Sequence, residues 1–239
     1  SQFVCHDIVD KVLLRDLPSL YGISDVQELN SLFTMIAYHS GMEFSYDGMS
    51  KESGVKKETI RRYIQYLEAA FLIKVVNKTD DTARRFQRQT TFKIYLTNPS
   101  LRCALFEPVK MTDGNIGDMI ETAVYSQWIP RDERIAYANW KIGRTQGEVD
   151  MVGINDALQK PSWAVEVKWT DRFFDRPSEL SSLKYFMEKN HLSQALVTTI
   201  GQRGRKDMDF GTLHFIPSAC YAYTVGENTL RQAKRSFGL

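Results

Sequence analysis

Two short segments in the second half of the chain constrain its fold most strongly, because both have the pattern of β-strands. Residues 147–153 read GEVDMVG, and residues 163–169 read WAVEVKW. Side chains of a strand point alternately to its two faces, so Glu166 and Lys168 are predicted to share one face, with apolar residues on the other. If the two strands are neighbours, Asp150 can converge with Glu166 and Lys168 on one point.

Composition excludes several classes of protein. Of the 239 residues, 43% are hydrophobic and 25% are charged, which is typical of a globular protein with one large or two modest domains. No apolar stretch approaches the roughly 18 residues of a membrane span, so we expect no membrane partner and a cytoplasmic location. The scattered cysteines and histidines favour neither disulfides nor a zinc site. Because GxxxxGK[ST] and GxGxxG are absent, no nucleotide is expected in this chain.

The N-terminal half has apolar residues at helical spacing, followed by a helix-turn-helix pattern. We expect helices at residues 4–14 and 26–40. Further along, Gly54 separates two helical patterns, the second of which has apolar residues at i, i+4, i+7 and i+11. Two strands around a polar turn at residues 77–83 come next. Residues 1–112 are therefore predicted to form a helical winged-helix domain.

Basic residues concentrate in this half. From Lys51 to Lys93 there are eleven Lys or Arg and five Asp or Glu, a net charge of +6, whereas the whole chain carries +2. The candidate DNA contacts lie at the start of the second helix and on the wing: Lys56, Lys57, Arg61, Arg62, Arg84, Arg85 and Arg88. DNA is thus an expected partner. Two alternatives stay open: a winged helix that contacts only proteins, and wing arginines that form a solvated face.

Beyond a polar loop at residues 107–117 the pattern changes class. The expected elements are a helix at 116–128, strands at 134–140, 148–154 and 162–169, a helix at 179–189, a strand at 193–199, a basic loop at 201–211 and a strand near 213–216. This order of α, β, β, β, α, β predicts a second domain at residues 113–239. The chain as a whole is expected to be of the α/β (α+β) class.

The order of these elements, with Asp150 on the second strand and Glu166-x-Lys168 on the third, resembles the restriction-endonuclease-like fold and its PD-(D/E)xK motif. The proline of that motif is replaced here by Val149. The resemblance implies that Asp150 and Glu166 hold one or two Mg²⁺ or Mn²⁺ ions, with Glu121 of the first helix as an additional acid. Hard cations prefer oxygen ligands, and Mg²⁺ keeps several waters, so two or three carboxylates suffice. Lys168 would position water or stabilise phosphate charge, completing a catalytic set for phosphodiester hydrolysis of DNA.

Each of these residues also has a plainer interpretation. The acids and the lysine of the two strands could form an ion pair on a half-buried sheet, and Glu121 could be a solvated helix residue. Glu148 shares the face of Asp150 and is either a further ligand or a flanking residue. Lys184 is a weaker candidate for a phosphate contact. Trp163 and Trp169 fit core positions better than base-stacking ones.

A second resemblance covers residues 13–199. The segments that carry it are, in order, RDLPSLYGI, SKESGVKKETIRRYIQYLEAAFLI, FKIYLTNPSLRCAL, GDMIETAVYSQW, GEVDMVG and AVEVKW. Together they resemble the C-terminal region of a large family of bacterial and archaeal AAA-type ATPases. The resemblance implies an ATPase module before residue 1, and a possible homo-oligomer formed through it. Retained acids do not by themselves imply activity, so the alternative is a catalytically silent nuclease-like module that binds DNA or protein and regulates the attached ATPase.

Overall fold

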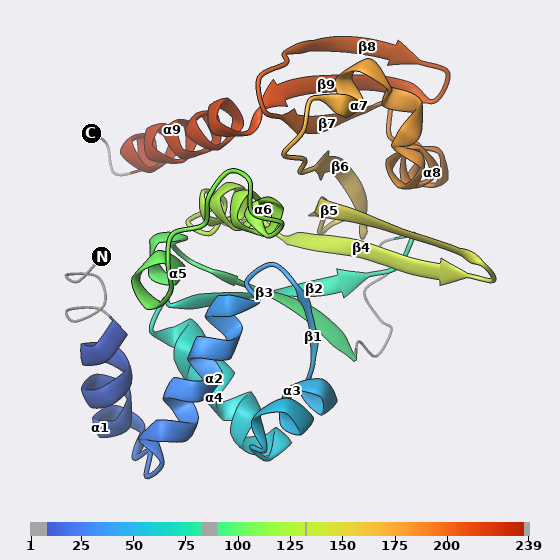
Figure 1. The fold of residues 1–239 in the computed structure, drawn as a ribbon. Coiled ribbons are helices and arrows are strands. Elements are labelled where there is room, and N and C mark those ends of the chain that lie inside the picture. Colours follow the sequence, from blue (N-terminus) through green and yellow to red (C-terminus); the bar gives the residue numbers. More distant parts are fainter. Residues whose placement is uncertain (1–8, 83–89, 132, 237–239) are drawn as a thin grey trace. The chain divides into compact units, whose positions relative to one another are not determined.

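The chain is a mixed α/β protein, seen in a computed structural model (Figure 1). The α/β class expected from the sequence is therefore confirmed. The structure describes residues 9–82, 90–131 and 133–236. Internal contacts divide the chain into two compact units, Ser1–Val75 with Thr90–Thr122 and Val76–Gln89 with Ala123–Leu239. The described residues 76–82 thus group with the second unit, and residues 113–122 with the first. No helix of the described ranges is long and apolar enough to cross a membrane.

The first unit is mainly helical. In chain order it contains a π-helical turn (Val12–Asp16), α1 (Leu17–Tyr21), α2 (Val26–Tyr38), β1 (Glu43–Ser45), α3 (Tyr46–Ser53), α4 (Lys57–Ala69), the start of β2 (Ile73–Thr79), β3 (Thr91–Leu96), α5 (Ser100–Leu105) and most of α6 (Ile116–Ser126). Strand β3 lies between β1 and β2, and β1 runs antiparallel to it.

Local signals explain the α3–turn–α4 segment. The Ser45 hydroxyl accepts a hydrogen bond from the Gly48 N–H at 3.0 Å and caps the start of α3. Gly54 ends that helix with a φ of 74°, a left-handed conformation that glycine adopts without steric cost. Helix α4 then buries Ile60 and Leu67 in the apolar core of this unit, which it shares with α2. The two helices expected on either side of Gly54 are therefore present. Phe71, expected on the buried face as the i+11 position, instead lies beyond the end of α4 and is 77% exposed.

The second unit is built around a sheet. Its elements are β4 (Ile135–Ile142), β5 (Thr145–Asn155), β6 (Lys160–Glu166), α7 (Arg172–Asp175), a 3₁₀ turn (Pro177–Glu179), α8 (Ser181–Asn190), β7 (Gln194–Thr199), β8 (Gly204–Met208), β9 (Gly211–Pro217) and α9 (Ser218–Ser236). The strand order is β4-β5-β6-β7-β9-β8. Strands β4, β5 and β6 are antiparallel neighbours, whereas β7 runs parallel to both β6 and β9.

Helix α8 connects β6 to β7 and covers one face of this sheet. Its buried Leu183, Phe186 and Met187 belong to one core cluster with residues of β4, β5, β6, β7 and β9. The Phe186 ring stacks on Trp140 of β4, with ring centroids 6.0 Å apart. A helical crossover of this kind is what joins two parallel strands, so it accounts for the change from antiparallel to parallel pairing at β6.

Three expectations for the second unit differ from the structure. Strand β6 ends at Glu166, so Lys168 lies beyond the strand rather than inside it. The segment expected to be a basic loop at residues 201–211 contains β8, an edge strand antiparallel to β9. Its sequence GRKDM lacks the apolar alternation that marks a half-buried strand, and none of its residues is buried. Helix α9, which follows the last expected strand, was also absent from the expectations.

Candidate functional site

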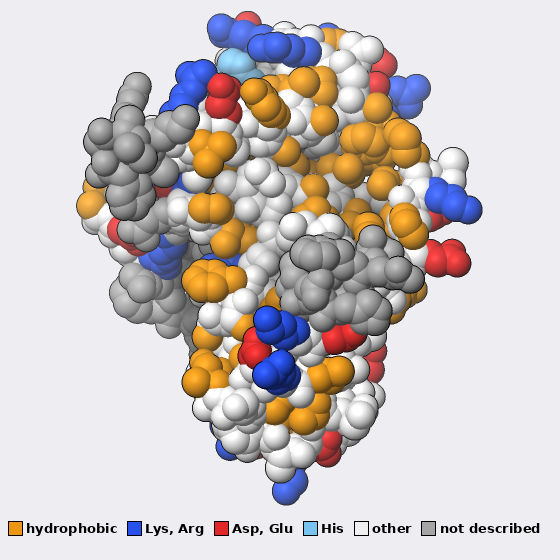
Figure 2. All heavy atoms as spheres, turned by 90° about the vertical axis from the view of Figure 1, so that its left-hand side faces the viewer, with side chains coloured by type: hydrophobic (Ala, Val, Ile, Leu, Met, Phe, Trp, Pro, Cys, Tyr) orange, Lys and Arg blue, Asp and Glu red, His pale blue; other side chains and the backbone are white. Residues whose placement is uncertain are grey.

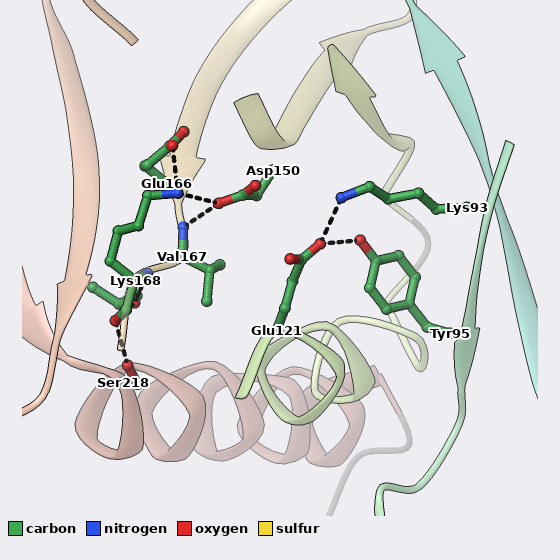
Figure 3. Close-up of polar contacts among 9 residues, drawn as sticks. Lys93, Tyr95, Glu121, Asp150, Glu166, Val167, Lys168 and Ser218 are labelled. Atoms are coloured by element: carbon green, nitrogen blue, oxygen red, sulfur yellow. Dashed lines mark hydrogen bonds and ion pairs between the residues drawn. The ribbon is translucent and has the colours of Figure 1, made fainter. Parts of the chain in front are cut away.

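Asp150, Glu166 and Lys168 meet at the end of β6 (Figure 3). The Lys168 Nζ atom lies 2.7 Å from Glu166 Oε1 and 3.5 Å from Asp150 Oδ2. Asp150 and Glu166 are 7% and 6% exposed, whereas the Lys168 side chain is 28% exposed. The structure thus brings these three predicted residues together, with the acids buried and the lysine reaching them from the surface.

Strand register explains this convergence. Met151 of β5 pairs with Val165 of β6, so the next pair along the antiparallel ladder brings Asp150 opposite Glu166. The backbone N–H of Val167 donates a hydrogen bond of 2.7 Å to Asp150 Oδ2, which fixes the carboxylate at the strand end. The acids therefore come from neighbouring strands rather than from one loop.

Burial sets the electrostatics of Glu166. Desolvation, followed by the charge of Asp150, raises the pKa of Glu166 from 4.5 to about 8, while Lys168 opposes the shift. One carboxyl oxygen, Oε2, is buried and has no hydrogen-bond partner among the described residues. Such an oxygen is costly unless a proton or a cation satisfies it. The site consequently favours a proton on Glu166 near neutral pH, or a positive ion in its place.

A divalent cation fits this donor set. Mg²⁺ and Mn²⁺ prefer oxygen ligands, and Mg²⁺ is commonly held by one or two carboxylates with waters completing its shell. Asp150 and Glu166 supply two buried carboxyl groups, and the unpartnered Oε2 gives one of them an available lone pair. Within the described part of the chain no group of three or more His, Cys, Asp or Glu side chains could hold a metal ion. A cation here would thus rest on two protein carboxylates.

Glu121, the third predicted acid, lies on α6 within the first unit. Its Oε1 atom accepts a hydrogen bond of 2.9 Å from Lys93 Nζ and another from the Tyr95 hydroxyl (Figure 3). Glu121 and Lys93 are both buried. The alternative of a solvated helix acid is therefore wrong, since Glu121 forms a buried ion pair with a lysine of β3.

The secondary candidates have partners of their own. Glu148 accepts a 2.8 Å hydrogen bond from the Asn139 side chain of the neighbouring strand. Lys184 lies 3.2 Å from Asp209, on the exposed side of α8. Trp163 stacks against Trp128 with ring centroids 4.9 Å apart.

The predicted DNA contacts of the first unit are exposed at the start of α4. Lys56, Lys57, Arg61 and Arg62 are all exposed. Lys57 forms an ion pair with Asp47, and the Arg61 guanidinium lies 4.8 Å from the centroid of the Tyr46 ring. Arg84, Arg85 and Arg88 lie outside the described residues. On the face drawn in Figure 2, Lys and Arg side chains form small separate groups and not a continuous basic surface.

Two hydroxyl residues and one acid beside the site were not predicted from the sequence. Thr198 at the end of β7 exchanges two hydrogen bonds with the backbone of Lys168. Ser218, the first residue of α9, donates to the same Lys168 carbonyl at 3.3 Å. Asp171 accepts from three successive N–H groups of residues 200–202, which lowers its pKa, Gly201 having the largest effect. The sequence feature that could have indicated Thr198 is the polar pair Thr198 and Thr199 at the carboxyl end of an otherwise apolar strand.

Comparisons with known proteins give one match. A family model described as a domain of unknown function (DUF8612) matches residues 1–112. The matched segment ends in the loop between α5 and α6, and its description carries no activity. Searches of curated proteins and of solved structures found no match.

Proposed function

We propose that the second unit is a restriction-endonuclease-like domain that hydrolyses DNA phosphodiester bonds with Mg²⁺ or Mn²⁺, and that the first unit is a winged helix that holds DNA. The observation that carries the proposal is the meeting of Asp150, Glu166 and Lys168 at one strand end, with a buried carboxyl oxygen of Glu166 left without a partner. The succession of α6, the three strands β4 to β6, the short helix α7, helix α8 and strand β7 supports the same interpretation, although most of α6 groups with the first unit.

Each residue has a defined task in this proposal. Asp150 and Glu166 would hold the ion through their carboxyl oxygens. A bound divalent ion supplies Lewis-acid polarisation of the scissile phosphate and acidifies the attacking water. Lys168 presents a positive charge at the partly exposed rim of the buried acids, where negative charge develops on the phosphate. The hydrogen bond from the Val167 N–H keeps Asp150 oriented before substrate arrives.

A cleavage assay tests the hydrolytic part. Wild-type protein is incubated with duplex, single-stranded and branched DNA in Mg²⁺, Mn²⁺ or EDTA, beside Glu166→Gln and Lys168→Met. Lys160→Met is the matched lysine control, because Lys160 is an exposed lysine at the start of β6, whereas Glu166 ends that strand. We expect metal-dependent cleavage by the wild type and the control, and loss of cleavage in the other two variants. A wild type that cleaves nothing, or variants that cleave equally well, would rule the proposal out.

The winged-helix part is tested through salt dependence. Affinity for DNA should fall with salt by a slope of about 0.9 per phosphate neutralised. Replacing the exposed residues Lys57, Arg61 and Arg62 of α4 with Gln should lower that slope by about 3. Each removed cation no longer neutralises a phosphate, so no counterion is released there. A control variant neutralises three other exposed cations of the first unit, Lys11, Arg15 and Lys110. Equal slopes in the two triple variants would favour protein partners over DNA.

A second function, a catalytically silent nuclease-like module that regulates an attached ATPase, is favoured by a specific observation. The described residues provide no third metal-ligating side chain for the site, and Glu121 is engaged by Lys93 and Tyr95. Calorimetric titration with Mn²⁺ separates the two functions. Binding that disappears in Glu166→Gln supports the hydrolytic proposal, and absence of binding by the wild type supports the silent module.

A further inference from the structure

Strands β6 and β7 separate at the point where the candidate site begins. Their parallel ladder pairs Val165 with Leu196 and Glu166 with Val197, and β6 ends there. Two residues later, Lys168 lies beyond the end of its own strand. Something other than strand pairing must therefore satisfy its backbone groups at the carboxyl edge of the sheet.

One hydroxyl group performs this task. The Lys168 N–H donates to Thr198 Oγ1 at 2.8 Å, and the Thr198 hydroxyl donates to the Lys168 carbonyl at 3.0 Å. Thr198 is fully buried, so its hydroxyl has no contact with bulk water. The hydroxyl of Ser218 also reaches the Lys168 carbonyl, at 3.3 Å, and donates to Thr199 O at 3.0 Å. The backbone of Lys168 is thus fixed on both of its polar groups.

We infer that Thr198 is a positioning residue that holds Lys168 over the two acids, by taking the place of the missing strand pairing at its backbone. The lysine side chain is a flexible stem of four carbons. If its backbone is held in place, the positions that its ammonium group can reach are restricted. With that origin fixed, Nζ lies within 2.7 Å of Glu166 and 3.5 Å of Asp150. The importance of this position for hydrolysis rests on the proposed function, whereas the positioning itself does not.

Chemical labelling of Lys168 tests the positioning without metal or DNA. Limited acetylation followed by mass spectrometry gives its rate relative to Lys141 and Lys160, two exposed lysines of the same unit. In Thr198→Val, which keeps the shape but removes both bonds, we expect Lys168 to react about 5- to 30-fold faster, the change that corresponds to losing one or two net hydrogen bonds. Thr198→Ser retains the hydroxyl and should restore the wild-type rate.

The outcomes separate positioning from a general structural role. If Thr198→Val lowers the melting temperature but leaves the relative rate at Lys168 unchanged, the inference is overturned. If that variant does not fold, Ser218→Ala takes its place and should accelerate Lys168 by a smaller factor, and no acceleration there also overturns it. Where the wild type cleaves DNA, Thr198→Val should lower kcat with little change in KM. Absence of cleavage by the wild type would defeat the proposed function alone, because the labelling result is independent of it.

Discussion

The buried carboxyl of Glu166 predicts an unusual dependence of stability on pH. Its pKa in the folded protein is about 8, against 4.5 for an ordinary glutamate, because burial and the neighbouring Asp150 charge disfavour ionisation. Between these two values the folded state binds more protons than the unfolded state. The free energy of unfolding must therefore fall as pH rises from 4.5 to 8, and become constant beyond either limit. Most carboxyl groups act in the opposite direction, since their pKa values are lowered by folding.

The magnitude follows from the same two values. Each pH unit across that interval is worth about 1.4 kcal/mol, so the Glu166 contribution between pH 5 and pH 8 amounts to about 3 to 4 kcal/mol. Glu166→Gln has almost the same shape and cannot ionise. The stability of the variant minus that of the wild type should therefore increase by that amount from pH 5 to pH 8, because titrating groups that do not interact with Glu166 cancel in the difference.

Tryptophan fluorescence makes the measurement specific. All four tryptophans, at positions 128, 140, 163 and 169, belong to the second unit. Urea unfolding in EDTA, followed by this fluorescence at several pH values, reports on the unit that contains Glu166. Lys184→Met serves as a control that should parallel the wild type. Parallel curves for wild type and Glu166→Gln would refute the reasoning, and so would a wild-type stability that rises relative to the variant between pH 5 and pH 8.

Three further predictions concern the metal, a strained residue and a close contact. At the proposed metal site Mn²⁺ would displace the Glu166 proton, so the affinity measured by calorimetry should rise about 9-fold from pH 6 to pH 7, and a constant affinity would contradict this. Phe71 has a φ of 57° and is 77% exposed, so Phe71→Gly should stabilise the first unit by about 1 kcal/mol in urea melts followed by circular dichroism, and a loss of stability would count against it. A Cβ at Gly153 would overlap the Trp163 ring, so Gly153→Ala should destabilise the second unit by about 1 to 3 kcal/mol in the fluorescence assay. Gly201→Ala, where a Cβ meets only Asp171 at 3.7 Å, should change little, and equal losses in both would argue against the overlap.

Features with local causes could be predicted from the sequence. The start of α3 depends on Ser45, three residues from its hydrogen-bond donor, and its end depends on Gly54. The residue patterns GEVDMVG and WAVEVKW likewise predict β5 and most of β6. Asp150 and Glu166 could therefore be paired from the residue pattern of the two strands. Each of these inferences uses residues that are close together in the chain.

Features that depend on residues far apart in the chain could not be predicted from the sequence. The ion pair of Glu121 with Lys93 joins residues 28 positions apart, and no spacing rule links a helix acid to a lysine of an earlier strand. Strand β8 has polar residues on both of its faces, so its sequence does not mark it as a strand. Its pairing depends on the neighbouring strand β9. The end of β6 at Glu166 was missed for the same reason, since alternation continues in the sequence through Trp169.

The role of Lys168 depends on this last difference. Had β6 continued to Trp169, as alternation predicts, the Lys168 N–H and carbonyl would be paired with backbone, and its side chain would leave a flat sheet surface. Because the strand stops at Glu166, the Val167 N–H binds Asp150 and the backbone of Lys168 binds Thr198, 30 residues away. The end of the strand therefore allows the side chains of Asp150, Glu166 and Lys168 to meet at one point. The same residue pattern in an unbroken strand would supply the charges without this geometry.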